Sequence, residues 1–140
     1  MKQILLIIAG LSSLLMADFS RDNGTQIVTD SSTNLQWQDD VVGSTMNWES
    51  AISHCEALTL NGHDDWRLPN FNELYSIADR STYNPAMDPA FSAVSTSYYW
   101  SSTTDASHTS VAWVVDFYLG YDDNVYKTGS CYVRCVRDGQ

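Results

Sequence analysis

The spacing of apolar residues changes from strand-type to helix-type and back again along the chain, and this order restricts the fold class. Two segments have the apolar spacing of a buried helix face, from Trp48 to Leu58 and from Asn70 to about Asp79. Short strand patterns lie at 26–29, 35–38, 98–102, 111–118 and 126–137. The last of them is either continuous or broken at Gly129-Ser130. Strands, two helices and then consecutive strands predict an α+β domain, with the helices packed on short antiparallel sheets joined by long loops.

Polar residues mark the ends of both predicted helices. Asn47 can cap the start of the first helix, and Asn61-Gly62 is a typical stop signal behind it. Asn70 and Glu73 have the spacing of a capping box at the start of the second helix. Both helices therefore have defined starting points.

Two segments between these elements have the composition of loops. The segment 80–97 contains two prolines and little periodicity, so we expect a long loop held in place by Tyr83, Met87 and Phe91. The segment 119–124 is rich in turn residues, which predicts a hairpin loop between two late strands.

The N-terminal segment has the order of regions found in a secretory signal peptide. Lys2 precedes an apolar stretch from Ile4 to Leu15, and the small residue Ala17 comes before a polar segment. The apolar stretch is shorter than the roughly 20 residues that span a bilayer. We therefore expect a signal peptide at 1–17, a single domain at 18–140 with no transmembrane helix, and an exported protein, either periplasmic or extracellular at the cell surface.

Export would place the three cysteines in an oxidising compartment, where thiols tend to pair. If 130–136 is one strand, Cys131 and Cys135 are about 13 Å apart, too far for a disulfide. Cys55 can then pair with either of them. We favour Cys55 with Cys135, which leaves Cys131 free.

Charge and motifs argue against several classes of function. The formal net charge of -10 would repel the phosphate backbone of a nucleic acid, so we expect no nucleic-acid partner. The hydrolase, zinc-protease, phosphate-loop and dinucleotide motifs are all absent from the sequence. We therefore predict a protein that is not an enzyme and that needs no cofactor.

Pairs of acidic residues in the predicted loops are candidate calcium ligands, because calcium prefers hard oxygen ligands. Three such clusters occur, at 39–40, 64–65 and 122–124, and turns attract aspartate for local hydrogen-bonding reasons alone. We expect no metal site. If one loop binds calcium, the best candidate is Asp122, Asp123 and Asn124 at the predicted hairpin tip.

The aromatic residues divide into two groups. Five tryptophans lie among apolar neighbours, and we expect structural packing from Trp37, Trp48, Trp66, Trp100 and Trp113. Tyrosines instead gather near acidic residues around the late strands, a composition typical of recognition surfaces. The ligand-binding residues predicted there are Tyr98, Tyr118, Tyr121, Asp122, Asp123, Asn124 and Tyr126.

Two motifs and their order resemble a known family. The motifs are Asp65-Trp66-Arg67-Leu68-Pro69 and Tyr99-Trp100-Ser101-Ser102. Further matching segments lie at 30–38, 47–51, 55–58, 112–117 and 132–137. Together they resemble the Lcl C-terminal domain family, named for a bacterial collagen-like adhesin, over about residues 19–138.

The resemblance implies a C-type-lectin-like fold and a secreted or surface bacterial domain mostly without an assigned activity. It also supports a Cys55–Cys135 bridge and a scaffold role for Arg67, which would fasten loops. We expect a secreted adhesion or binding module that recognises an extracellular protein or glycan through the late-strand loops. The alternatives are an oxidative enzyme related to the formylglycine-generating enzymes, with Cys131 as the candidate thiol, and a structural envelope protein.

Overall fold

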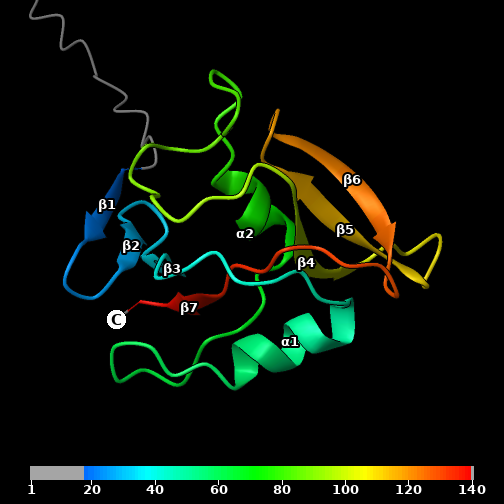
Figure 1. Cartoon of the computed structure of the whole chain (residues 1–140), viewed down its shortest axis with the longest axis horizontal. Helices are drawn as coiled ribbons and strands as arrows, with labels where there is room; N and C mark the ends of the chain where they lie inside the picture. The colour runs from blue at the N-terminus through cyan, green and yellow to red at the C-terminus, as the bar shows by residue number, and fades with distance from the viewer. Residues whose placement is uncertain (1–17, 140) are drawn as a thin grey trace, which may run out of the picture.

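The computed structural model describes residues 18–139, which form two small antiparallel sheets and two short helices (Figure 1). The first sheet has the order β1-β2-β3-β7 and the second the order β4-β5-β6. The elements are β1 (Phe19–Asp22), β2 (Ile27–Asp30), β3 (Leu35–Gln38), α1 (Trp48–Glu56), α2 (Phe71–Ser76), β4 (Tyr98–Thr104), β5 (Val111–Asp116), β6 (Tyr121–Tyr126) and β7 (Val136–Asp138). The predicted α+β class is confirmed. The predicted signal peptide lies outside the described residues, and no helix within 18–139 is long and apolar enough to cross a membrane.

The first sheet has one buried face and one polar face, because side chains alternate along each strand. Val28, Trp37 and Val136 are in register across β2, β3 and β7, and all three are fully buried. The neighbouring row, Thr29 and Gln36, lies on the opposite face. The apolar row packs this sheet onto the core, while the polar row stays accessible.

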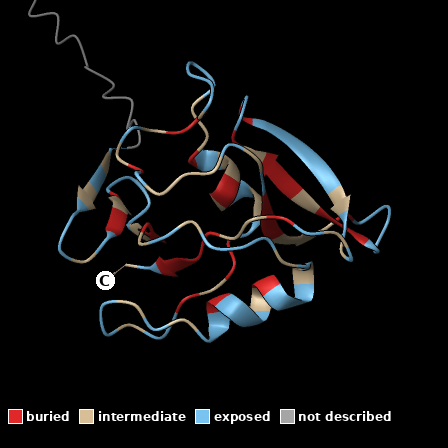
Figure 2. Cartoon of the chain, viewed as in Figure 1, coloured by how far each residue is buried: buried red, intermediate tan, exposed pale blue. Residues whose placement is uncertain are grey.

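The second sheet is covered by a helix on each face. Trp100 and Val114 are paired across β4 and β5 and belong to the same core cluster as Cys55 of α1. The adjacent pair, Tyr99 and Val115, packs on the other face in the cluster that holds α2. Figure 2 shows β5 largely buried and β6 largely exposed at the edge of this sheet.

Helix α1 begins where the sequence predicts and ends earlier. The Asn47 side chain accepts a hydrogen bond from the Ser50 amide at 2.9 Å. The helix closes at Ala57, however, and does not reach Leu58. Asn61 and Gly62, both with positive φ angles of 52° and 75°, form a separate tight turn in the segment 60–63. The stop signal therefore belongs to this turn.

Helix α2 has the predicted capping box but is shorter than predicted. The Glu73 amide donates to Asn70 at 2.8 Å, and the Asn70 amide donates to the Glu73 carboxylate at 2.9 Å. The helix ends at Ser76 and not near Asp79. Tertiary contacts end the helix early, because Ala78 forms a β-bridge with Met87 and the Asp79 amide donates a hydrogen bond to the Ala86 carbonyl.

Replacing Asn70 with alanine is expected to lower the free energy of unfolding by about 1 kcal/mol, because the Glu73 amide would lose its acceptor. Urea denaturation measures the change. Asn72→Ala is the matched control, since Asn72 is exposed within the same helix and alanine is the better helix former there. Equal losses in the two variants would contradict the capping role.

The long loop at 80–97 is held by two of the three predicted residues. Met87 and Phe91 are buried, but Tyr83 is 72% exposed, so its predicted anchoring role is wrong. Backbone hydrogen bonds replace it: the Asn84 amide donates to Tyr118 at 2.8 Å and the Ala86 amide donates to Phe117 at 2.8 Å. These bonds fix the loop without the tyrosine ring.

The late strands differ most from prediction. The segment predicted as a hairpin loop, 119–124, lies mostly in β6, and the turn precedes it at 117–120. The predicted strand 126–137 is interrupted by a turn and loop at 127–130, which contain the alternative break at Gly129-Ser130. Tyr126 ends β6, Tyr132 forms an isolated bridge with Tyr99 of β4, and β7 joins the other sheet. Aspartate and asparagine favour turns over strands in isolation, but pairing with β5 along all six residues overrides that preference.

The Cys55–Cys135 disulfide joins α1 to the residue before β7, as predicted, with 5.4 Å between the Cα atoms. Cys131 is free and buried. The cross-link lies in the core beside Ala51 and Trp66, so it ties the first helix to the C-terminal part of the chain.

Candidate functional site

Five of the seven residues predicted to recognise a ligand lie on β6, an edge strand of the second sheet. Tyr118 lies in the turn before β6, and Tyr98 lies on β4, where its hydroxyl reaches Asp123 of β6. We call these seven residues the tyrosine edge: Tyr98, Tyr118, Tyr121, Asp122, Asp123, Asn124 and Tyr126. Its tyrosine side chains are among the most exposed large residues, at 59% for Tyr121 and 60% for Tyr126. Among the strands of residues 18–139, β6 pairs only with β5, so its other side is open to a partner.

The pleat of the second sheet places the strand residues of the tyrosine edge on two opposite faces. Tyr121 is in register with Asp116, which is in turn in register with Tyr98, so these residues share one face with Asp123. The alternate positions, Asp122, Asn124 and Tyr126, lie on the opposite face. A partner that contacts both groups has to approach along the edge of the sheet.

On the first of these faces, Tyr98 and Asp123 are linked. The Tyr98 hydroxyl donates to the Asp123 carboxylate at 3.2 Å. The negative charge of Asp123 raises the pKa of the Tyr98 hydroxyl. Tyr98 therefore stays protonated, and the pair presents a phenol next to a carboxylate.

On the opposite face, the side chains contact the turn between β4 and β5. The Asn124 amide donates to Asp105 at 3.1 Å, and the Tyr126 ring lies edge-on to His108 with 5.6 Å between the ring centres. Hydrogen bonds from Ser107 hold the pKa of the Asp105 carboxyl below its usual range. The turn thus supports the edge and fixes two of its side chains.

The calcium candidate is not placed as predicted. Asp122, Asp123 and Asn124 lie within a strand and not at a hairpin tip, so Asp122 and Asp123 point to opposite faces. Two carboxylates directed in this way do not converge on one ion. Between residues 18 and 139, no group of three or more histidine, cysteine or acidic side chains is arranged to hold a metal.

Sequence reasoning did not foresee the role of Asp39, which lies after β3. Its fully buried carboxylate contacts the Arg21 guanidinium at 2.5 Å and that of Arg134 at 2.9 Å. It also accepts hydrogen bonds from the amides of Ser92 and Ala93. Burial acts to raise the Asp39 pKa, but these hydrogen bonds and the charge of Arg134 outweigh it and lower the pKa. Asp39 therefore fastens the 80–97 loop to both ends of the chain.

Arg67 has the kind of contacts that the resemblance implies. Its guanidinium forms two hydrogen bonds with the Glu73 carboxylate, both 2.7 Å, and contacts Asp138 at 2.9 Å. Burial acts to raise the pKa of Glu73, but the hydrogen bonds from Arg67 and from the Asn70 amide outweigh it and lower the pKa. Arg67 thus joins α2 to the end of β7.

The tryptophans divide by depth. Trp37, Trp66 and Trp100 are buried in the core, whereas Trp48 and Trp113 are only half-buried. The two half-buried rings still make specific contacts. Trp48 donates to the Ser101 carbonyl at 2.9 Å, and Trp113 packs against Phe71 of α2. All five therefore serve packing, and none belongs to the tyrosine edge.

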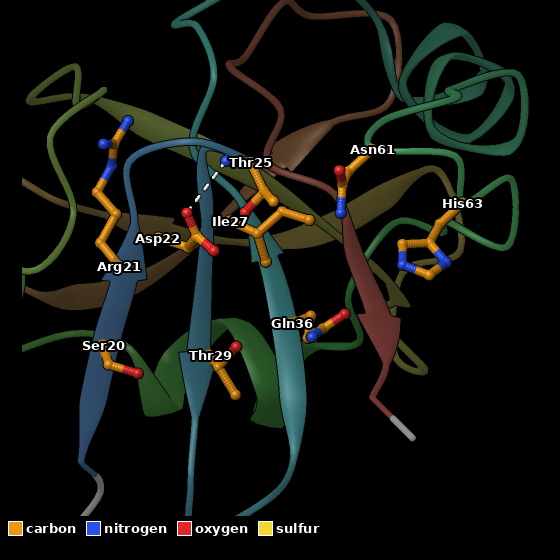
Figure 3. Close-up of a pocket in the computed structure, with 9 residues that line it drawn as sticks. All are labelled: Ser20, Arg21, Asp22, Thr25, Ile27, Thr29, Gln36, Asn61 and His63. Atoms are coloured by element: carbon orange, nitrogen blue, oxygen red, sulfur yellow. Dashed lines mark hydrogen bonds between the residues drawn. The ribbon is translucent and has the colours of Figure 1, made fainter.

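A hollow on the polar face of the first sheet was not predicted (Figure 3). We call it the polar hollow; it has a volume of about 280 Å³. Its lining residues are Ser20, Arg21, Asp22, Thr25, Ile27, Thr29, Gln36, Asn61 and His63. Only strand register and the separate 60–63 turn bring these residues together, so no local sequence motif marks them.

Cys131 carries a free thiol and lies in the hydrophobic core. It is 3% exposed, and burial raises its pKa to about 11. At neutral pH the group is therefore an uncharged thiol, which is a poor nucleophile and a poor metal ligand.

Comparison with known families agrees with the sequence motifs. The profile of the Lcl C-terminal domain matches residues 26–137, which is most of the chain. No curated protein matches the sequence. The matched range includes both helices, the disulfide, the whole tyrosine edge and both sheets except β1 and the last residue of β7.

Proposed function

Because the chain belongs to the Lcl C-terminal domain family, we propose that it is an exported, non-enzymatic binding module whose partner contacts the tyrosine edge. The observation that carries the proposal is the exposure of Tyr121 and Tyr126, at 59% and 60%, on a strand with one free side. Tyrosine provides a large contact area with little loss of side-chain entropy, which is why it is enriched at recognition surfaces.

The negative charge of the tyrosine edge restricts the classes of partner that can bind there. Asp122 and Asp123 are exposed beside the tyrosines, and the whole chain has a net charge of -10. A sulfated polysaccharide or a nucleic acid would be repelled. The partner is therefore an extracellular protein with a neutral or basic surface, or an uncharged glycan.

Export is supported by the Cys55–Cys135 disulfide, since such bonds persist mainly outside the cytosol. The leader-like segment at 1–17 has the same implication. The protein would then act in the periplasm or at the cell surface. Two helices packed on small antiparallel sheets, with a disulfide from the first helix to the residue before the last strand, also support the C-type-lectin-like fold that the family resemblance implies.

A non-enzymatic role is supported by the state of the one free thiol. Oxidative chemistry of the formylglycine-generating type needs a reactive cysteine, and Cys131 is buried with a raised pKa. The tyrosine edge, in contrast, is exposed. Recognition therefore fits the described residues better than covalent chemistry.

The proposal is tested with the double variant Tyr121→Ala, Asp122→Ala. Immobilised protein is used to capture partners from an envelope extract and to probe a glycan array, and the affinity for any captured partner is then measured. We expect the double variant to bind at least about tenfold more weakly, because truncating a central aromatic contact typically costs more than 1 kcal/mol.

Tyr83→Ala is the matched control, because Tyr83 is 72% exposed and lies on the 80–97 loop, outside the tyrosine edge. It should bind like the wild type. Full retention of the partner by the double variant would exclude the tyrosine edge as the binding surface.

A further inference from the structure

The polar hollow is built from a row of side chains held in register by the first sheet. Ser20 pairs with Thr29, and Thr29 pairs with Gln36, so one polar group from each of β1, β2 and β3 lies on the same face. Paired residues on neighbouring strands are about 5 Å apart. Across from this row, the 60–63 turn supplies Asn61 and His63 (Figure 3).

The row contains donors and acceptors that are open to a ligand. The side chains of Ser20 and Thr29 line the hollow, and Ser20 is exposed while Thr29 is half-buried, so both hydroxyls are accessible to a ligand. Gln36 is different, because its carbonyl oxygen accepts a hydrogen bond from Arg137, which is itself held by Asp65 at 2.7 Å. That contact fixes the amide and leaves its NH₂ group available to a ligand.

The charged residues at the hollow are already engaged. The Arg21 guanidinium donates to the carboxylate and carbonyl of Asp39, and Figure 3 shows it directed away from Thr29 and Gln36. One oxygen of Asp22 accepts from the amides of Gly24 and Thr25 at 2.8 and 3.2 Å. The hollow therefore has no uncommitted cation for a phosphate or sulfate.

The remaining lining excludes other ligand classes. Ile27 is the one large apolar residue of the lining and is only 5% exposed, so an apolar ligand would find little surface to cover. A single carboxylate, that of Asp22, is too few for a cation site. What remains is a set of hydroxyl, amide and imidazole groups, which suits a ligand with several uncharged hydroxyls.

We propose that the polar hollow binds a neutral saccharide unit through Ser20, Thr29 and Gln36. The hollow lies on the first sheet, whereas the tyrosine edge lies on the second, so this site is separate from the one under the proposed function. Its volume of about 280 Å³ suits a single small ring and not an oligosaccharide. Backbone register, and not a flexible loop, sets the position of the three groups.

The test is a nuclear magnetic resonance titration of the ¹⁵N-labelled protein with glucose, galactose, mannose, N-acetylglucosamine and a sulfated monosaccharide. Because a few hydrogen bonds give weak binding, we expect a Kd of the order of 1 mM for at least one neutral sugar. The side-chain NH₂ signal of Gln36 and the backbone signal of Thr29 should shift. Absence of shifts with all neutral sugars, or tighter binding of the sulfated one, would overturn the proposal.

Variants locate the binding. Ser20→Ala combined with Thr29→Val removes two hydroxyls while keeping the strands. This double variant should bind the sugar with at least about tenfold lower affinity. Thr109→Val, an exposed threonine outside the hollow, is the control and should not change the affinity. Tyr121→Ala, Asp122→Ala should also bind the sugar normally, which separates this site from the tyrosine edge. An unchanged affinity in the Ser20, Thr29 variant would refute the assignment.

Discussion

Replacing Asp39 with asparagine is expected to lower the free energy of unfolding by about 3–5 kcal/mol, because it would leave two arginines without their buried counter-ion. One carboxylate oxygen accepts from Arg134 and Ala93, and the other accepts from Arg21 and Ser92. An amide group in either position would place a donor against donors. Isosteric shape therefore does not rescue the contact.

Urea denaturation at several pH values checks this expectation. The Asp39 pKa is lower in the folded protein than in the unfolded chain, so its carboxylate contributes stability above about pH 4, and that contribution is lost as the pH falls through the folded pKa. Asp39→Asn should remove this part of the acid sensitivity. Asp40→Asn is the control, because within the described part of the chain the Asp40 carboxylate accepts only from its neighbour Val41. Similar losses for both variants would contradict the role of Asp39.

Removing the disulfide with Cys55→Ala, Cys135→Ala is expected to lower the free energy of unfolding by about 4 kcal/mol, with a fall in Tm of roughly 15 °C. The cross-link spans 80 residues, so its loss frees a long loop of the unfolded chain. Calorimetry of the oxidised wild type and the double variant measures the difference.

Cys131→Ala is the control for the disulfide, because it alters a buried cysteine of the same core cluster but leaves the bridge intact. It should cost about 1 kcal/mol. Mass spectrometry of the oxidised protein should find Cys55 joined to Cys135. A double variant as stable as the wild type would contradict the stabilising role of the cross-link.

Local patterns were sufficient for much of the fold. Asn47 and Asn70 cap the two helices as predicted, because an N-cap depends on residues three positions apart. The α+β class follows from the same periodicity. The pairing of Cys55 with Cys135 was also correct, although the segment before Cys135 is not the continuous strand from which its geometry was argued.

Pairing between distant segments determines two strands that the sequence pattern did not predict. Strand β1 was not predicted, since the four residues Phe19–Asp22 have little pattern and are stabilised by pairing with β2. Strand β6 was interpreted as a loop, because Asp122, Asp123 and Asn124 favour turns when taken alone. The grouping of exposed tyrosines with acidic residues around the late strands was nevertheless predicted by composition, while its division between two faces required the register.

The buried role of Asp39 and the polar hollow share a different reason for being missed. Asp39 contacts Ser92 and Arg134, which lie 53 and 95 positions away, and a lone aspartate after a strand has the composition of a turn. The hollow depends on which residues of three strands lie side by side. Neither arrangement leaves a motif within one segment of the chain.

The most direct test of the account is hydrogen exchange of the protein alone and bound to a partner captured by the wild type. Binding at the tyrosine edge predicts slower exchange of the amides in 121–126, with those of 19–38 unchanged. Slower exchange confined to the first sheet or to α1, with 121–126 exchanging as in the free protein, would contradict it.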